Sequence, residues 1–395
     1  MTEFSATTRA VRAGIESDTQ HGAVVPALHL STNYTFEGFG KKRPYDYSRS
    51  GNPTRDLLGG ALAELEHGAG AVITASGMAA VALVLELVPA GGLVIAAHDC
   101  YGGTWRLLDA WQKKGRFRVR FVNLTDPLAL AEALTWKPDV FWVETPSNPL
   151  LRITDVRHVS AAAHTVGALV VVDNTFLSPA LQQPLTLGAD IVVHSTTKYI
   201  NGHSDVVGGA VVAKDAAVAQ QLTWWANCTG VTGAPFDSFL TLRGLRTLGP
   251  RLRAHQENAL HVAHLLNGHD AVEKVYYPGL ADHPGHALAA RQQSGFGAML
   301  SFELNADTAG IAAFLDGLNC FSLAESLGGV ESLVAHPASM THAAMAPEAR
   351  RAAGIADNLL RLSIGIEDSA DLVADLSAGL QRALDVEKTA RRASA

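Results

Sequence analysis

Short apolar runs alternate with longer amphipathic stretches from about residue 61 to about residue 213. The runs are four or five residues long and rich in Val, Ile and Ala. Runs of this kind indicate strands buried on both faces, and their alternation with helices is typical of a mostly parallel sheet in an α/β fold. We therefore predict strands at Ala71–Thr74, Leu93–Ala97, Val119–Val122, Val140–Glu144, Leu169–Asp173, Ile191–Ser195 and Gly209–Ala213, and helices at Gly77–Val88, Thr104–Lys114, Pro127–Leu134 and Val156–Val166.

The two ends of the chain depart from this alternation. Around Ser31–Pro53 the residues Tyr, Asn, Gly, Ser and Pro are frequent, which predicts an extended arm. Beyond about residue 250 the pattern predicts an α+β block, and we expect the polar tail Glu387–Ala395 to fray. The predicted parts are an N-terminal arm (1–60), a large α/β domain (61–250) and a smaller C-terminal α+β domain (251–395). In the last part we expect helices at Arg253–Leu266 and Asp368–Leu384 and strands at Ala298–Leu304, Phe321–Leu323 and Leu359–Ile364.

Charge and cysteine content narrow the class of protein. The 395 residues carry a net charge of −7 and are 48% hydrophobic, so we expect a folded chain that binds neither nucleic acid nor an anionic membrane. We find no apolar run that could span a membrane and no secretory signal. Cys100, Cys228 and Cys320 lie far apart, and the 16 histidines form no cluster with carboxylates. We therefore expect no disulfide framework, no metal site and a cytoplasmic location.

A lysine follows one of the predicted strands. Lys198 comes shortly after the run Ile191–Ser195, and the hydroxyls of Ser195 and Thr197 flank it. Ligands bind at the strand ends of open α/β sheets. Taken alone, the lysine is more simply explained as a loop charge that reaches solvent. The flanking hydroxyls, however, are suited to a phosphate group.

An aspartate ends a second predicted strand. Asp173 follows an all-apolar run, where a carboxylate is costly unless a positive group pairs with it. A lysine for an imine, an aspartate for a protonated pyridine nitrogen and hydroxyls for a phosphate together predict a pyridoxal phosphate site. Ser76 and Gly77 begin a predicted helix whose first N–H groups could bind the phosphate, although a plain helix cap explains them equally well.

An arginine lies inside a predicted strand of the C-terminal domain. Arg361 is surrounded by apolar residues in Leu359–Ile364, where a guanidinium needs a bidentate anion. A substrate carboxylate would serve, and an ion pair with a protein carboxylate is the alternative. The glycine motifs of ATP and NAD sites, and the HExxH and GxSxG motifs, do not occur.

With these residues in view, the chain resembles the Cys/Met-metabolism family of pyridoxal phosphate enzymes, which has fold type I. The run Asp190–Ser204 is similar to the lysine signature of the family, and the resemblance extends from about Arg9 to about Leu384. Further matching motifs are Tyr47–Thr54, Ser76–Met78, Tyr101–Gly103, Glu144–Pro149, Val172–Thr175 and Ala324–Gly329. A closer similarity to the bacterial members that make cystathionine is carried by His98–Gly103, Trp224–Asn227, Glu331–Leu333 and Met340–Ala343.

The resemblance implies roles around the cofactor. Lys198 would form the imine and move protons, and Asp173 would pair with the pyridine nitrogen. Tyr101 would stack on the ring and accept a proton from the substrate's ammonium group, although alone it is more simply explained as an aromatic residue in a turn. Asn148 would approach the ring hydroxyl and the substrate. The phosphate would be held by Gly77, Met78, Ser195 and Thr197, and by Tyr47 and Arg49 of a neighbouring subunit.

The resemblance also implies a binding site for the substrate. Ser326 and Arg361 would meet its α-carboxylate, and we include the adjacent Glu325 among the candidate substrate-binding residues. Arg106, five residues after Tyr101, is our candidate for a contact with the acyl carboxylate. A solvated helix charge is the alternative for Arg106, and an exposed loop pair is the alternative for the residues from the neighbouring subunit. The family commonly forms tetramers, so we expect a homo-oligomer.

The activity implied is γ-replacement on O-succinylhomoserine or O-acetylhomoserine with cysteine, which gives cystathionine in methionine biosynthesis. The alternatives are γ-elimination of cystathionine and a non-catalytic paralogue that binds pyridoxal phosphate. Methionine γ-lyase activity is disfavoured, because Tyr101–Gly103 lacks the cysteine that family members with that activity carry there. A third alternative is a nucleotide-binding α/β protein without pyridoxal phosphate. Such a protein would give a colourless preparation, so the absorbance spectrum distinguishes it from the others.

Overall fold

The computed structural model describes residues 4–341, 348, 350 and 353–393. The chain forms two compact units. The large unit consists of Met1–His98, Gly103–Glu144 and Thr154–Gly249. The C-terminal unit consists of Asp99–Gly102, Thr145–Ile153 and Pro250–Ala395, so two short segments of the predicted α/β range group with the C-terminal part.

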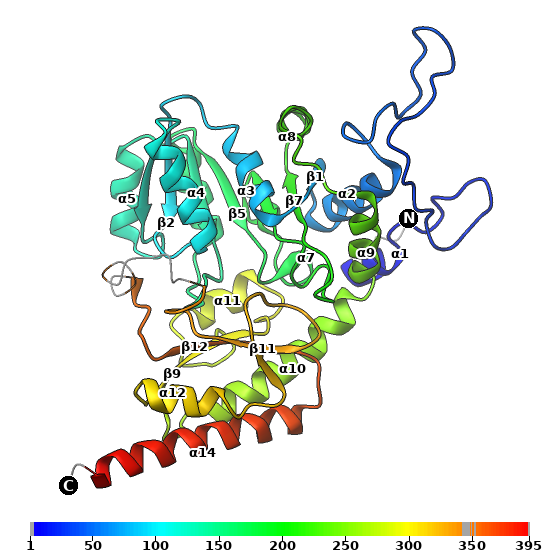
Figure 1. The fold of residues 1–395 in the computed structure, drawn as a ribbon. Coiled ribbons are helices and arrows are strands. Elements are labelled where there is room, and N and C mark those ends of the chain that lie inside the picture. The colour runs from blue at the N-terminus through cyan, green and yellow to red at the C-terminus, as the bar shows by residue number, and fades with distance from the viewer. Residues whose placement is uncertain (1–3, 342–347, 349, 351–352, 394–395) are drawn as a thin grey trace. The chain divides into compact units, whose positions relative to one another are not determined.

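A seven-stranded sheet forms the centre of the large unit, with strand order β1-β7-β6-β5-β4-β2-β3 (Figure 1). The strand β7 is antiparallel to β1 and β6, and the other neighbours are parallel. The predicted α/β fold with a mostly parallel sheet is therefore confirmed. The strands are β1 (Gly70–Thr74), β2 (Leu93–Ala97), β3 (Arg118–Val122), β4 (Val140–Glu144), β5 (Leu169–Asp173), β6 (Ile191–His194) and β7 (Gly209–Ala213).

Helices cover the two faces of this sheet. The helix α3 (Gly77–Leu85) packs on the face that carries Val72 and Val193. The helix α2 (Pro53–Glu66) lies against the other face, where Gly59 passes close to Ile73. The remaining helices of the large unit are α1 (Ala6–Arg12), α4 (Gly102–Lys113), α5 (Pro127–Thr135), α6 (Val156–His164), α7 (Ser178–Leu181), the 3₁₀ helix η1 (Pro184–Leu187), α8 (Ala216–Thr229) and α9 (Pro235–Leu245).

The helix α2 corrects the expectation that the first 60 residues are an extended arm. Asn52 caps it by accepting bonds from the N–H groups of Thr54 and Arg55, and Pro53 takes the first helical position. Leu58 and Leu62 are buried on the sheet. The pair Gly59–Gly60 breaks the apolar periodicity, which is why the pattern did not reveal the helix.

The C-terminal unit is built on a five-stranded sheet of order β10-β11-β12-β9-β8. The predicted α+β character is confirmed, and β8 and β11 were missed. The helix α14 continues to Ala393, so the expectation of a frayed tail from Glu387 is wrong; Glu387 accepts a bond from the N–H of Asp307. The elements are α10 (Leu248–Leu266), β8 (Val272–Tyr276), α11 (His286–Gln292), β9 (Met299–Leu304), α12 (Thr308–Leu315), β10 (Phe321–Leu323), β11 (Ser332–Ala335), β12 (Leu359–Ser363) and α14 (Ser369–Ala393).

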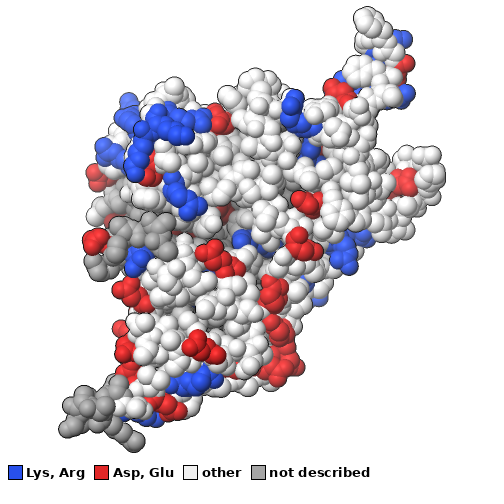
Figure 2. Space-filling model, viewed as in Figure 1, with Lys and Arg blue, Asp and Glu red and all other residues white. Residues whose placement is uncertain are grey.

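Basic side chains gather near one edge of the large sheet, in the region of α4 and α5 (Figure 2). Arg118 and Arg120 are exposed on β3, the edge strand. Charged side chains on an edge strand oppose pairing with a strand of another chain. No helix in the described residues is both long and apolar enough to cross a membrane.

Candidate active site

Asp173 lies at the carboxyl end of β5, partly buried. The N–H of Thr175 donates to its Oδ1 at 3.0 Å. Burial raises the pKa of the Asp173 carboxyl, and the Thr175 and His194 side chains oppose this shift. In the part of the chain that the structure describes, no lysine or arginine forms an ion pair with Asp173. The carboxylate therefore suits a cationic ligand.

The candidate lysine lies in the loop after β6, the strand that pairs with β5. Lys198 is half-buried, and its N–H donates to the carbonyl of Ser195 at 3.3 Å. The N–H of Ser195 donates to Oγ1 of Thr175 at 2.9 Å. Thr175 therefore links Asp173 to Ser195, the candidate phosphate ligand.

The N-terminus of α3 meets the same loop. A Cβ atom on Gly77 would lie 2.7 Å from Cβ of Ser195, so only glycine allows this approach. Ser76 caps the helix by accepting from the N–H of Ala79 at 3.1 Å, and Met78 packs against the core. The helix thus brings its unbonded N–H groups to Ser195, which is the geometry that a phosphate needs.

Thr197 makes different contacts from those its predicted role requires. Its Oγ1 donates to the carbonyl of Gly208 at 3.2 Å and accepts from the N–H of Gly208 at 2.9 Å. A bond from this hydroxyl to a phosphate would compete with the bond to the carbonyl.

Tyr47 and Arg49 lie on an exposed segment of the large unit. Tyr47 is 44% exposed. The Arg49 guanidinium lies 5.4 Å from the centre of the Tyr47 ring, and its Nε donates to Oδ1 of Asn227 at 3.0 Å. Neither residue bonds to Ser195 or Thr197 within the described chain.

A second group of candidate residues meets within the C-terminal unit. Arg361, on β12, is only 3% exposed. Its Nη1 donates to Oδ1 of Asn148 at 3.0 Å, and its Nη2 donates to the carbonyl of Ser326 at 2.9 Å. Ser326 has a φ of +81°, a strained backbone conformation for a residue with a side chain. The side chain of Asn148 and the backbone carbonyl of Ser326 thus hold a buried guanidinium through neutral oxygens.

Tyr101 lies on a short segment that is tied to the segment of Asn148. Asp99 Oδ2 accepts from Oγ of Ser147 at 2.7 Å and from Nη1 of Arg152 at 2.9 Å. Tyr101 is 41% exposed. Asp99 therefore joins the backbone segments that present Tyr101 and Asn148.

Two candidates lie at the surface. Glu325 is exposed beside Ser326. Arg106 is exposed on α4 and makes no hydrogen bond or ion pair with a described residue. His342 and Ala343, part of the motif Met340–Ala343, lie outside the described residues.

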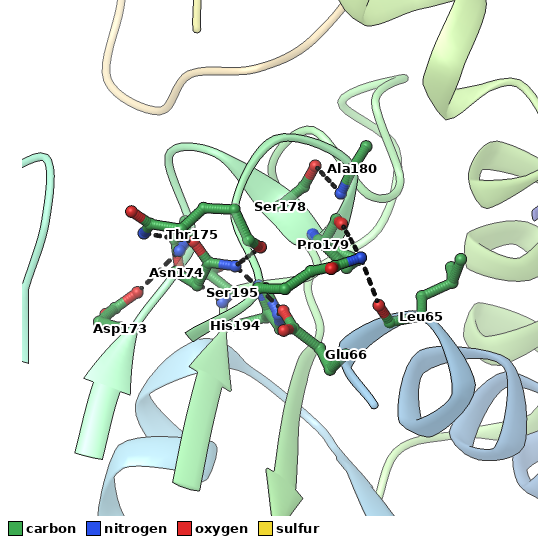
Figure 3. Close-up of polar contacts among 12 residues, drawn as sticks. Leu65, Glu66, Asp173, Asn174, Thr175, Ser178, Pro179, Ala180, His194 and Ser195 are labelled. Carbon is green, nitrogen blue, oxygen red and sulfur yellow. Dashed lines mark hydrogen bonds and ion pairs between the residues drawn. The ribbon is translucent and has the colours of Figure 1, made fainter. Parts of the chain in front are cut away.

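The sequence did not reveal a polar cluster behind the strand ends (Figure 3). Glu66, the last residue of α2, and His194, the last residue of β6, are both 0% exposed. His194 Nε2 and Glu66 Oε1 lie 2.6 Å apart, and Nδ2 of Asn174 donates to the same Oε1 at 3.0 Å. A histidine in an otherwise apolar strand was the available signal, but its partner is 128 positions away in the chain.

Taken together, the residues of the large unit fit pyridoxal phosphate. Asp173 ends β5, and Lys198 with the hydroxyls of Ser195 and Thr197 follows β6. The N-terminus of α3 approaches Ser195 at Gly77, where only glycine fits.

Comparisons with known proteins agree. A family model described as Cys/Met metabolism PLP-dependent enzyme matches residues 7–381. Cystathionine gamma-synthase of Escherichia coli K12 is 58% identical over 377 residues, which are 95% of this chain and 98% of that protein. Cystathionine beta-lyase of Coxiella burnetii is 45% identical over 375 residues, covering 94% of this chain and 97% of that protein. A crystal structure of cystathionine gamma synthase from Xanthomonas oryzae pv. oryzae in complex with cystathionine has a TM-score of 0.96 and 67% identity, covering 97% of this chain and 100% of that one.

Proposed function

The chain belongs to the Cys/Met-metabolism family of pyridoxal phosphate-dependent enzymes, and from this premise we propose that it has cystathionine γ-synthase activity. Its cofactor is pyridoxal phosphate and its substrates are small amino acids. The reaction breaks the bond between Cγ and the ester oxygen of an activated homoserine and forms a bond from Cγ to the sulfur of cysteine, so the acyloxy group leaves as a carboxylate. It yields cystathionine and the free acid.

The similarity to synthases is the observation that carries this proposal. The synthases of Escherichia coli and Xanthomonas oryzae are 58% and 67% identical to this chain, against 45% for the β-lyase of Coxiella burnetii. The geometry supports it, because Lys198 follows β6, Asp173 ends the neighbouring strand β5, and the buried guanidinium of Arg361 contacts only neutral oxygens in the bonds to Asn148 and Ser326.

Residues of the large unit serve the cofactor and the proton transfers. When bound, pyridoxal phosphate supplies an electron sink for negative charge that forms at the substrate's Cα. Lys198 would hold the cofactor through its Nζ, and the same amine, once free, would remove the proton from the substrate's Cα. Asp173 keeps the ring nitrogen protonated, and Ser195 with the N–H groups at Gly77 and Met78 binds the phosphate.

Residues of the C-terminal unit serve the substrate. Arg361 binds the α-carboxylate through its guanidinium, which Asn148 and the Ser326 carbonyl orient. Tyr101 takes the ammonium proton, so that the amine can attack. From the large unit, the side chain of Arg106 on α4 is the candidate for binding a succinyl carboxylate.

Exposed apolar residues support a homo-oligomer with shared active sites. In the first 50 residues Val24, Leu30, Phe36 and Phe39 are exposed, the last fully. Apolar surface of this kind marks a contact with another chain. We place Tyr47 and Arg49 at the phosphate of the neighbouring subunit. Free thiols at Cys228 and Cys320 support a cytoplasmic location.

Product analysis tests the proposal. The enzyme is incubated with O-succinylhomoserine, with and without cysteine, and the products are separated by chromatography. We expect cystathionine and succinate when cysteine is present. Release of ammonia and a 2-oxo acid as the main products with cysteine present would assign γ-elimination instead.

A further inference from the structure

Glu66 contacts the ends of two neighbouring strands from the face of the sheet that α2 covers. Its Oε1 accepts from Nδ2 of Asn174, which follows β5, and lies 2.6 Å from Nε2 of His194, which ends β6 (Figure 3). Asn174 is held further by Gln182, whose carbonyl accepts at 2.8 Å and whose Nε2 donates to Oδ1 at 3.0 Å. One carboxylate oxygen is thus the common partner of both strand ends.

The residues that Glu66 holds are neighbours of the two candidate cofactor anchors. Successive side chains of a strand point to opposite faces. Asp173 directly precedes Asn174, and Ser195 directly follows His194. Glu66 therefore contacts, on the α2 face, the residues adjacent to the anchor for the ring nitrogen and the anchor for the phosphate.

Backbone pairing alone does not fix the spacing of these anchors. The parallel register of β5 and β6 ends at Asp173 opposite Val193, and the N–H of Asn174 makes the last ladder bond, to the carbonyl of Val193 at 3.0 Å. Beyond it, the links are the bond from the N–H of Ser195 to Thr175 on one face and Glu66 on the other.

Stability is a poor explanation for this cluster. Glu66, His194 and Asn174 are each 0% exposed. Removing such groups from water costs free energy that their hydrogen bonds do little more than offset. Replacing both partners of a buried hydrogen bond by apolar groups of similar shape often leaves stability nearly unchanged. A geometric role accounts for the position better.

We propose that Glu66 is a positioning residue that clamps the ends of β5 and β6 and so sets the distance between Asp173 and Ser195. The inference rests on the cofactor site of the proposed function. The pyridine ring of pyridoxal phosphate is rigid and its phosphate is held on a short arm, so the ring nitrogen and the phosphate reach both anchors at once only over a narrow range of spacings. Two linked contacts bind far more tightly than either alone when the geometry matches, and the gain is lost when it does not.

The test compares whole and partial ligands on the apoprotein. Affinities for pyridoxal phosphate, for pyridoxal and for inorganic phosphate are measured for wild type, Glu66→Ala and Glu66→Gln. Glu64→Gln is the matched control, because Glu64 lies two residues earlier on the same helix and is exposed. Circular dichroism and Tm establish that each variant is folded.

We expect Glu66→Ala to lower the affinity for pyridoxal phosphate by about 10- to 100-fold, because a small misplacement of the anchors costs that much. Pyridoxal and inorganic phosphate should each bind to this variant as they bind to wild type. Glu66→Gln keeps an oxygen that accepts both bonds, and its amide replaces an Oε2 that has no hydrogen-bond partner among the described residues, so the affinity of this variant for pyridoxal phosphate stays near wild type. Glu64→Gln changes nothing. Asn174→Ala removes one arm of the clamp and serves if Glu66→Ala does not fold; the same selective loss is expected.

Equal losses for all three ligands would assign Glu66 a merely structural role and overturn the clamp. A Glu66→Gln variant as weak as Glu66→Ala would show that charge acts instead of geometry, and would overturn it too. The cofactor site is tested separately. Wild type should show the visible absorbance of an imine, and Lys198→Ala should lack it. If wild type lacks this absorbance, the proposed function fails. If wild type shows it but the Glu66 variants give one of the two contradicting results above, the clamp alone fails.

Discussion

At the scale of single residues, charged side chains within apolar strands indicated the candidate site. Asp173 and Arg361 each stood in an apolar run, and the cost of burying a lone charge indicated a ligand. The supporting partners were not predictable in the same way. Asn148 lies 213 positions from Arg361, and only the fold brings them together.

Asp173→Asn should affect the apoprotein and the holoprotein in opposite directions. Burial raises the pKa of the Asp173 carboxyl, so the folded apoprotein holds that proton more tightly than the unfolded chain does. The apoprotein therefore loses stability from this group as pH rises above the ordinary aspartate pKa. At pH 7 the neutral amide should raise the Tm of the apoprotein and lower the affinity for pyridoxal phosphate by about tenfold or more.

Thermal melts of both apoproteins between pH 4 and pH 8, with cofactor titrations at pH 7, make the measurement. The Tm difference should grow with pH. A variant that binds the cofactor as tightly as wild type would exclude Asp173 as the partner of the ring nitrogen.

Arg106→Ala should separate the two ester substrates. A succinyl group ends in a carboxylate and an acetyl group does not. One charged hydrogen bond is worth about 1.5–3 kcal/mol, so kcat/KM for O-succinylhomoserine should fall by roughly one to two decades. The value for O-acetylhomoserine should stay nearly unchanged. Equal losses for both esters, or none for either, would assign Arg106 to the solvated surface of α4.

At the scale of elements, Asp99 connects two short segments that carry candidate residues. It holds Ser147 and Arg152, and Arg152 Nη2 also donates to the carbonyl of Ala353 at 2.8 Å. Asp99→Asn weakens these charged bonds without changing the side chain's shape. We expect kcat to fall by about tenfold, because Tyr101 loses its fixed position. Asp109→Asn, which breaks an exposed pair with Lys113, is the control.

Combining Asp99→Asn with Tyr101→Phe distinguishes this role from general destabilisation. If Asp99 acts through Tyr101, the double variant should lose less than the product of the two single losses. Independent, multiplicative losses in steady-state kinetics would mean that Asp99 does not position Tyr101.

Elements were predictable where burial dictated the pattern. The inner strands of the large sheet are buried on both faces, so their sequences are apolar runs; β2 and β4 are examples. The helix α2 was not predictable, because Gly59–Gly60 interrupts its apolar stripe. The strand β8 was missed because the exposed pair Glu273 and Lys274 interrupts its apolar residues, and none of its residues is fully buried.

At the scale of the whole molecule, the proposed sharing of active sites predicts complementation. Tyr47 and Arg49 are exposed in one chain. Arg49→Ala subunits and Lys198→Ala subunits should each form poorly active enzymes. Unfolded together and refolded as hybrids, they should regain part of the activity, since one site then combines an intact Arg49 with an intact Lys198. Hybrids shown by mass spectrometry to have formed, yet without recovered activity, would argue against shared sites.

The central claim is that this enzyme makes cystathionine. The most direct measurement compares two values of kcat/KM for wild type under the same conditions: formation of cystathionine from O-succinylhomoserine with saturating cysteine, and cleavage of cystathionine. The account predicts that formation is the faster process. An enzyme that cleaves cystathionine faster than it makes it would contradict the account and assign the chain to the lyases of the family.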